Sequence, residues 1–228
     1  MDNKTNEVLR QATARLTPSL ASKSSTDNEP DMVLEAKIFR AHFYEVEPKF
    51  NPEKTDREVL NTIFAWVWRY DPCNYLGVDY DKGFFLYGNI GRGKSMTIKA
   101  MQKYMNSVKN RHYKREDYRL GAWWKTASEL ANIYAADGQP ALIQYAADSM
   151  NLIVDEFGRE PIPASNYGTK MNVLQFLLQL RYDKRRTTVT HITTNLTPDR
   201  LEPLYGDYVA DRCKEMFNFI EFEGESLR

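Results

Sequence analysis

The chain has 228 residues, of which 42% are hydrophobic and 27% are charged. That composition suits one sizeable core with a small accessory segment, and no run approaches the ~18 apolar residues that a membrane-spanning helix needs. Thirty-one basic residues balance 31 acidic ones, so strong non-specific attraction to nucleic acid is not expected, although a local basic patch is compatible with that total. With two cysteines and no signal-peptide pattern, the sequence predicts a cytoplasmic protein without a disulfide framework or a zinc site.

The N-terminal part of the chain divides into three predicted regions. Residues 17–30 are rich in Ser, Thr, Asp, Asn and Pro, a composition that cannot bury enough apolar surface to order itself. Residues 1–30 are therefore predicted to be a flexible tail. Residues 31–54 are predicted to form a helical N-terminal segment, because apolar residues recur there at helical spacing. The main domain is predicted over residues 55–228.

A stronger helix is predicted over Thr55–Tyr70, at the start of that domain. Thr55 and Glu58 have the spacing of a capping box, and a broad apolar face follows them. Trp66 and Trp68 are interpreted as core residues in preference to a base-stacking role.

Downstream of Lys82, short apolar runs alternate with helical segments. Strands are predicted at Phe84–Tyr87, Leu120–Trp124, Asn151–Asp155, Thr187–Thr194 and Phe217–Phe222. Helices are predicted at Lys94–Val108, from a cap of Thr126 with Glu129, or of Ser128 alone, to Gly138, at Lys170–Tyr182 and at Gly206–Met216. Such alternation implies a parallel sheet covered by helices on both faces.

A phosphate-binding loop is predicted at Gly88–Ser95, which reads GNIGRGKS and satisfies the GxxxxGK[ST] pattern. A buried strand before it and an amphipathic helix after it argue against a chance match, in which the loop would be a glycine-rich turn with an exposed lysine. Lys94 is expected to bridge the β- and γ-phosphates of ATP, and the Ser95 hydroxyl is expected to ligate Mg²⁺. The predicted nucleotide-binding residues are Gly88, Asn89, Ile90, Gly91, Arg92, Gly93, Lys94, Ser95 and Met96.

Two acids end the apolar run LIVDE and fit the Walker B element. Asp155 is expected to hold Mg²⁺ through water, next to Ser95. Glu156 is expected to orient and deprotonate the attacking water. A small-molecule kinase needs no such base, because its substrate supplies the hydroxyl, so the pair favours hydrolysis over phosphoryl transfer.

Asn195 follows the predicted strand Thr187–Thr194 and has two interpretations. If that strand lies between the strands of the loop and of the acids, Asn195 could hold the lytic water or sense the γ-phosphate. Otherwise it caps the turn before Thr197-Pro198, a common role for Asn. Spacing alone leaves both readings open.

Four segments together resemble the IstB/DnaC/DnaI group of AAA+ ATPases, which includes replicative helicase loaders and transposition helper ATPases. They are GFFLYGNIGRGKS, LIVDEFG, RYDKRRTTVTHITTNL and DRCKEMFNFIEFEGESLR, and the resemblance covers about Phe50 to Arg228. It implies an α/β, three-layer P-loop domain of the ASCE/AAA+ kind with a five-stranded, mostly parallel sheet. The residues after Asn195 are too few for a full helical AAA+ lid, which members of the group also lack or shorten.

The resemblance also implies roles for individual residues. Asn195 matches sensor 1, Arg212 matches the arginine finger that reaches the ATP of the next subunit, and Arg228 matches the sensor-2 arginine. Without the resemblance, Arg212 would be interpreted as a surface arginine on a terminal helix. Arg181 and Tyr182 match an Arg-Tyr pair of the group, whose role stays open between interface and core.

Two features depart from the pattern of the group. Arg92 stands where Thr or Val is more usual, and it could contact phosphate, contact an interface or point to solvent. The N-terminal segment matches no recognised loader domain, which leaves the partner open.

The function that the resemblance implies is an ATP-hydrolysing helper of DNA replication, with ATP and Mg²⁺ as cofactors and no membrane. It would assemble as a homo-oligomer on single- or double-stranded DNA and load or remodel a replicative helicase. The alternatives are a transposition helper ATPase that acts on a transposase and a nucleotide-switched interaction module with little turnover. The best basic cluster for DNA is Lys109, Arg111, Lys114 and Arg115, which a solvated helix end explains equally well.

Overall fold

A computed structural model of the chain describes residues 30–51, 56–70, 77–112, 117, 119–147 and 151–223. Residues 1–29 of the predicted tail lie outside these ranges. Arg228 also lies outside them. Within the described ranges, no helix combines the length and the apolarity needed to cross a bilayer.

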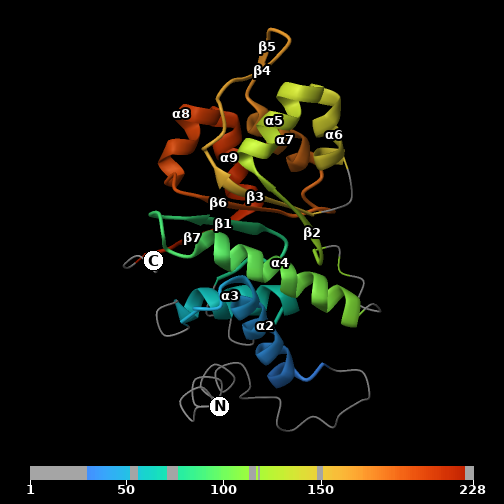
Figure 1. Ribbon diagram of the computed structural model, residues 1–228, viewed down its shortest axis with the longest axis vertical. Coiled ribbons are helices and arrows are strands. Elements are labelled where there is room, and N and C mark those ends of the chain that lie inside the picture. Colours follow the sequence, from blue (N-terminus) through green and yellow to red (C-terminus); the bar gives the residue numbers. More distant parts are fainter. Residues whose placement is uncertain are drawn as a thin grey trace.

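The centre of the fold is a five-stranded sheet in the order β2-β3-β6-β1-β7, with every neighbouring pair parallel (Figure 1). The strands are β1 Gly83–Tyr87, β2 Ala122–Thr126, β3 Asn151–Phe157, β6 Thr190–Thr194 and β7 Phe217–Glu221. This confirms the predicted α/β fold. Because β6 lies between β1 and β3, the segments that follow these three strands emerge side by side at the carboxyl edge of the sheet.

Helices cover both faces of this sheet (Figure 1). One face carries α2 Met32–Val46, α3 Arg57–Trp68 and α4 Lys94–Arg111, and the other carries α5 Ala127–Asp137, α6 Gln139–Ala147, α7 Val173–Asp183, α8 Leu201–Tyr205 and α9 Asp207–Met216. A 3₁₀ turn, η2 Pro198–Arg200, leads into α8.

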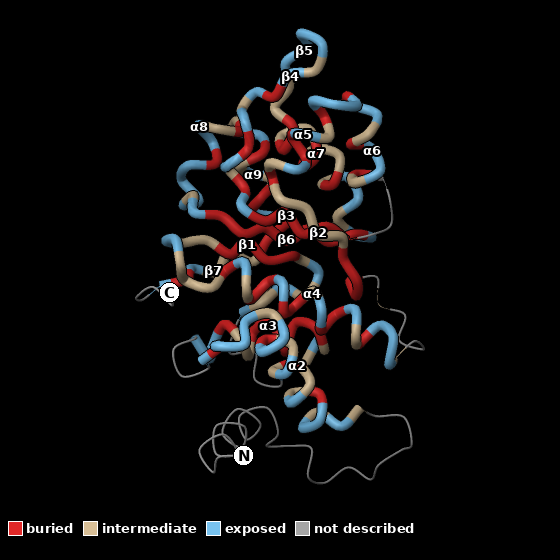
Figure 2. Tube along the Cα trace, viewed as in Figure 1, coloured by how far each residue is buried: buried red, intermediate tan, exposed pale blue. Residues whose placement is uncertain are grey.

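Each face of the sheet has its own apolar core. The central strands β3, β6 and β1 are almost entirely buried, whereas the edge strands β2 and β7 are mostly half-buried (Figure 2). The run GFFLY of β1 is apolar at consecutive positions because both of its faces are covered. Phe84 and Leu86 pack toward α4, whereas Phe85 packs toward α7 and α9. Trp66 of α3 is fully buried in the first core, as expected, and its indole donates a hydrogen bond to the Lys82 carbonyl oxygen at 2.8 Å.

A buried carboxylate joins α2 to α4. Glu35 accepts hydrogen bonds from Tyr104 at 2.9 Å, from His112 at 3.0 Å and from Arg111, with which it forms an ion pair. Burial by itself raises the pKa of Glu35, but the hydrogen bonds from Arg111, His112 and Tyr104 outweigh burial and hold that pKa below its usual value. The helical N-terminal segment is therefore docked on the helix that follows the phosphate loop.

Some predicted boundaries were wrong, and local capping explains two of them. The first residue of α3 is Arg57, and Asp56 is its N-cap in place of the predicted Thr55, since its side chain accepts from the amides of Glu58 and Val59. The predicted helix from Lys170 begins instead at Val173, because Asn172 caps it.

The residues before that cap form an unpredicted hairpin. It consists of β4 Ala164–Asn166 and β5 Thr169–Met171, which pair in antiparallel fashion. The strand predicted from Thr187 begins only at Thr190, because Thr187 and Thr188 hydrogen-bond back to the Lys184 carbonyl and prolong the turn after α7. The capping box of Thr126 and Glu129 at the start of α5 was predicted correctly.

Candidate functional site

The loop between β1 and α4 is held open by glycines. Gly88 has φ +127°, and a Cβ there would lie 2.6 Å from the Phe222 carbonyl oxygen, so no other residue fits. Gly93, with φ +87°, is the left-handed N-cap of α4. The loop therefore leads directly into the amino end of an 18-residue helix, where free amides and the helix dipole favour anions.

Lys94 is buried under this loop. Its Nζ donates to the carbonyl oxygens of Gly88 and Asn89, both at 2.7 Å, and to Asn195 Oδ1 at 2.9 Å. The Asn195 side chain therefore faces the phosphate loop. Burial, followed by the nearby charges of Arg159 and Arg92, lowers the pKa of Lys94 to about 8.

A hydroxyl and a carboxylate meet beside Lys94. Ser95 Oγ donates to Asp155 Oδ1 at 2.7 Å, and the Thr193 hydroxyl donates to the same oxygen. Asp155 is buried near the end of β3, where it pairs in register with Thr126 of β2. A serine hydroxyl next to a carboxylate at a phosphate loop matches the oxygen ligands that Mg²⁺ takes, so these residues fit the expected ion.

The backbone of β3 has an irregularity at Glu156, although the strand itself continues to Phe157. The φ of Glu156, +58°, is left-handed, and the register between β3 and β6 shifts at this point. The Glu156 amide donates to Thr193 Oγ1 at 3.1 Å, and its carboxylate pairs with Arg159 at 2.8 Å. This backbone turn leaves the Glu156 side chain half-exposed.

Lys94, Ser95, Glu156 and Asn195 border one cavity of about 620 Å³ at the carboxyl edge of the sheet. Asp155 lies behind this lining, in contact with Ser95 and Thr193. The charged residues that line the cavity are Glu47, Lys49, Arg92, Lys94, Glu156 and Arg159. Four cations face two carboxylates there, which suits a polyanion. Among the described residues, Arg92 Nη1 is buried without a hydrogen-bond partner, so this side chain does not simply point to solvent.

The comparisons with known proteins bear on the fold. No family model matches the sequence, and no curated protein matches it either. The solved structure of the DnaC helicase loader matches with a TM-score of 0.54 and 16% identity, over 79% of this chain and 98% of that one. A putative primosome component from Streptococcus pyogenes serotype M3 matches with a TM-score of 0.51 and 19% identity, over 87% of this chain and all of that one.

The chain has the fold of the DnaC helicase loader. This confirms the architecture that the sequence resemblance implied. At these identities the likeness concerns the fold, and the roles of individual residues rest on the geometry.

Not every predicted site residue lies at the first cavity. Arg212 lies on α9, against the rings of Tyr182 and Tyr208. Arg181 is a core residue, since it is fully buried and donates to Thr190 Oγ1 at 2.6 Å and to the Val189 carbonyl oxygen at 2.9 Å. The Arg-Tyr pair therefore has one member in the core and one toward the surface.

The basic cluster expected for DNA is also divided. Arg111 is bound by Glu35, so its charge is largely engaged within the protein. Lys109 is exposed at the end of α4. Lys114 and Arg115 lie outside the described residues.

Sequence reasoning missed Arg159, Glu47 and Lys49 as cavity residues. Arg159 could have been anticipated from the sequence, because it lies only three residues beyond the predicted site residue Glu156. Glu47 and Lys49 follow α2, and no sequence pattern indicates that the end of that helix borders the phosphate loop.

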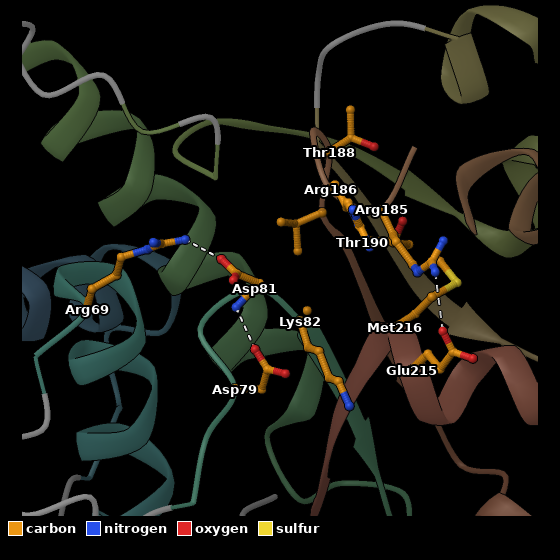
Figure 3. A pocket seen from close by; sticks show the side chains of 12 residues that line it. Arg69, Asp79, Asp81, Lys82, Arg185, Arg186, Thr188, Thr190, Glu215 and Met216 are labelled. Atoms are coloured by element: carbon orange, nitrogen blue, oxygen red, sulfur yellow. Dashed lines mark hydrogen bonds and ion pairs between the residues drawn. The ribbon is translucent and has the colours of Figure 1, made fainter. Parts of the chain in front are cut away.

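A second cavity of about 460 Å³ lies at the opposite edge of the sheet (Figure 3). Its lining includes Gly83 and Thr190, at the amino ends of β1 and β6. Several of its charges are already paired, as Arg69 is with Asp81 and Arg185 is with Glu215. It lacks the phosphate loop and the Glu156 carboxylate of the first cavity.

Proposed function

We propose that this protein is a Mg²⁺-dependent ATPase that assembles with itself on DNA and loads or remodels a replicative helicase. The observation that carries the proposal is the convergence of Lys94, the Ser95–Asp155 pair and Glu156 on one cationic cavity of an AAA+ fold. The likeness to a helicase loader favours a helicase over a transposase as the partner.

The proposed reaction is hydrolysis of the terminal phosphate of ATP. The Lys94 ammonium and the loop amides bind the β- and γ-phosphates. Ser95 and Asp155 would hold Mg²⁺, Asp155 through water, and the ion would supply positive charge to the phosphate oxygens. Glu156 takes a proton from water as the water oxygen bonds to the γ-phosphorus. The bond from that phosphorus to the β–γ bridging oxygen breaks, so ATP and water become ADP and phosphate.

Asn195 is proposed to respond to the terminal phosphate. Its amide oxygen already contacts Lys94 Nζ at 2.9 Å, at the end of the strand between the loop strand and the acid strand. In this position the Asn195 side chain would respond to a change in the contacts of Lys94, and it could orient the attacking water. The sensor-2 role of Arg228 stays a prediction.

Arg212 is proposed to act on the ATP of a second copy. Tyr182, which Arg212 contacts, adjoins residues of the cavity at the amino edge of the sheet, whereas Lys94 lies at the carboxyl edge. This separation supports a head-to-tail assembly in which each subunit supplies an arginine to its neighbour. An arginine supplied in this way stabilises the transition-state charge, so hydrolysis waits for assembly.

The test is steady-state ATP hydrolysis by the wild type and by Arg212→Ala, each with and without single-stranded DNA. We expect the wild type to turn over ATP and Arg212→Ala to lose about 10³-fold in turnover while still binding ATP. Restoration of activity when Arg212→Ala is mixed with Glu156→Gln subunits would establish supply from a neighbour. If the wild type shows no turnover, even with DNA and helicase, the ATPase function would be wrong and the nucleotide-switched interaction module would replace it.

The partner is tested separately. The tagged chain with ATP is expected to retain a purified replicative helicase and not a purified transposase. Retention of the transposase alone would replace helicase loading by the transposition-helper function.

A further inference from the structure

Arg212 lies in a small stack of arginine and tyrosine side chains. Its guanidinium carbon is 3.4 Å from the centre of the Tyr208 ring and 4.1 Å from the centre of the Tyr182 ring. The guanidinium of Arg185 also lies over Tyr182, at 3.9 Å. We call these four residues the Arg212 stack.

The positions of the stack follow from the packing of α9. Val209, Cys213 and Met216 form the buried face of this helix. Tyr208 and Arg212 are four residues apart, so they are neighbours on the helix surface, beside that buried face. Tyr182 comes from α7, which packs against α9.

Tyr182 is itself held in place. Its hydroxyl donates to Glu215 Oε2 at 2.8 Å, and this hydrogen bond raises the pKa of Tyr182. Glu215 also pairs with Arg185 at 3.4 Å, along the wall of the second cavity (Figure 3). One ring of the stack is therefore anchored, while the other, on the half-exposed Tyr208, reaches the solvent.

The charge of Arg212 is held by rings and not by a carboxylate. In the part of the chain that the structure describes, no ion pair or hydrogen bond involves its guanidinium. Rings above a guanidinium cover its flat faces and leave the N–H donors at its edges free. Arg212 is therefore fixed in direction and still able to bind an anion.

We propose that Tyr182 and Tyr208 are positioning residues that hold Arg212 ready for the phosphates bound by a second copy of this chain. The proposal rests on the ATPase function proposed above. It differs from a packing role for the tyrosines, because packing would matter equally in every subunit, whereas positioning matters only in the subunit that supplies the arginine.

The test uses mixed assemblies with distinguishable subunits. A donor subunit carries Glu156→Gln, so it is expected to bind ATP without hydrolysing it and keeps Arg212. An acceptor subunit carries Arg212→Ala and keeps an intact hydrolytic site. Only an acceptor beside a donor is expected to hydrolyse ATP, so the rate of the mixture measures the donated arginine.

Tyr208→Leu is then placed in one subunit at a time. In the donor, it is expected to lower the maximal rate by about five- to tenfold, because the guanidinium loses one of its two rings. In the acceptor, which has no Arg212, it is expected to have no effect. Tyr208→Phe in the donor keeps the ring and should restore most of the rate.

A matched control is Tyr167→Leu in the donor, since Tyr167 is 98% exposed and distant in sequence from the stack. An equal loss from Tyr208→Leu in both subunits, or no loss in the donor, would overturn the positioning role. A mixture that is inactive before any tyrosine is changed would instead overturn the shared active site itself. The two failures are thus separated by the order of the measurements.

Discussion

At the scale of single residues, the ammonium of Lys94 is expected to link the proposed nucleotide binding to protonation. Its pKa is about 8, because burial and then the charges of Arg159 and Arg92 disfavour the protonated form. Phosphate oxygens at the loop would favour that form again and raise the pKa. Nucleotide binding should therefore be accompanied by proton uptake above this pH.

The affinity for ATP is accordingly expected to depend on pH in one direction. Below about pH 8 Lys94 is protonated with or without nucleotide, so the dissociation constant should be flat there. Above that pH the free protein loses the proton and the complex keeps it, so affinity should fall by up to about tenfold per pH unit. Titration calorimetry in two buffers with different ionisation enthalpies measures the proton uptake directly.

Arg159→Gln supplies the control for the sign of this effect. It removes a positive charge that lowers the pKa of Lys94, so the fall in affinity should begin at higher pH. An unchanged profile would show that another group titrates.

The role proposed for Glu156 predicts a separation of turnover from binding. Glu156→Gln keeps the shape of the side chain but removes the base, so turnover should fall by about 10²-fold or more while ATP affinity stays close to that of the wild type. Glu202→Gln on the exposed surface of α8 is the matched control and should leave turnover unchanged. Equal turnover in Glu156→Gln and the wild type would remove Glu156 from the mechanism.

At the scale of helices and strands, two ion pairs connect α2 to α4 and differ in burial. Glu35 and Arg111 form the buried pair, whereas Glu45 and Lys103, at 3.1 Å, form an exposed one. Glu35→Ala leaves Arg111 and Tyr104 without their acceptor and should lower the free energy of unfolding by about 3 kcal/mol. Glu45→Ala should cost less than about 1 kcal/mol, because water screens that pair.

Urea unfolding at several pH values checks both changes. Because the folded-state pKa of Glu35 is lowered, its stabilising effect is present above the carboxyl pKa of the unfolded chain and is lost as pH falls through the folded-state value. The difference between the wild type and Glu35→Ala should therefore shrink in acid. A difference that stays constant with pH would mean that the carboxylate charge is not what stabilises α2.

The sequence predicted the strands and helices around the central sheet better than the segments between them. The structures of the run GFFLY and of the Thr126/Glu129 capping box are set by residues close together in the sequence. Both were predicted correctly. The β4–β5 hairpin and α8 were missed. Hairpin pairing joins residues across a turn and helix α8 has only five residues, so neither produces a clear hydrophobic period.

At the scale of the whole molecule, the phosphate loop and the Arg212 stack face different edges of one sheet. Under the proposed mechanism, the Arg212 of one copy would therefore not reach the γ-phosphate bound by that same copy. Copies arranged head to tail would supply it, and such an arrangement grows into a ring or a helical filament.

Assembly is therefore expected to depend on nucleotide. Sedimentation with ATP and Mg²⁺ should give species larger than the monomer, whereas ADP or the Lys94→Ala variant should give mostly monomer. Glu156→Gln should stabilise the larger species, because it binds ATP without hydrolysing it. A monomer under all of these conditions, including with DNA and helicase, would contradict the head-to-tail assembly.

The sequence by itself determined the parallel α/β class, the position of the phosphate loop and the two acids after an apolar strand. These features depend on residues close together in the chain, where spacing fixes geometry. Only the tertiary structure decided which way Asn195 faces, that Arg159, Glu47 and Lys49 border the cavity, and that Arg212 lies against two tyrosine rings. Such contacts depend on strand order and helix packing, which bring together residues whose separation in the sequence carries no local signal.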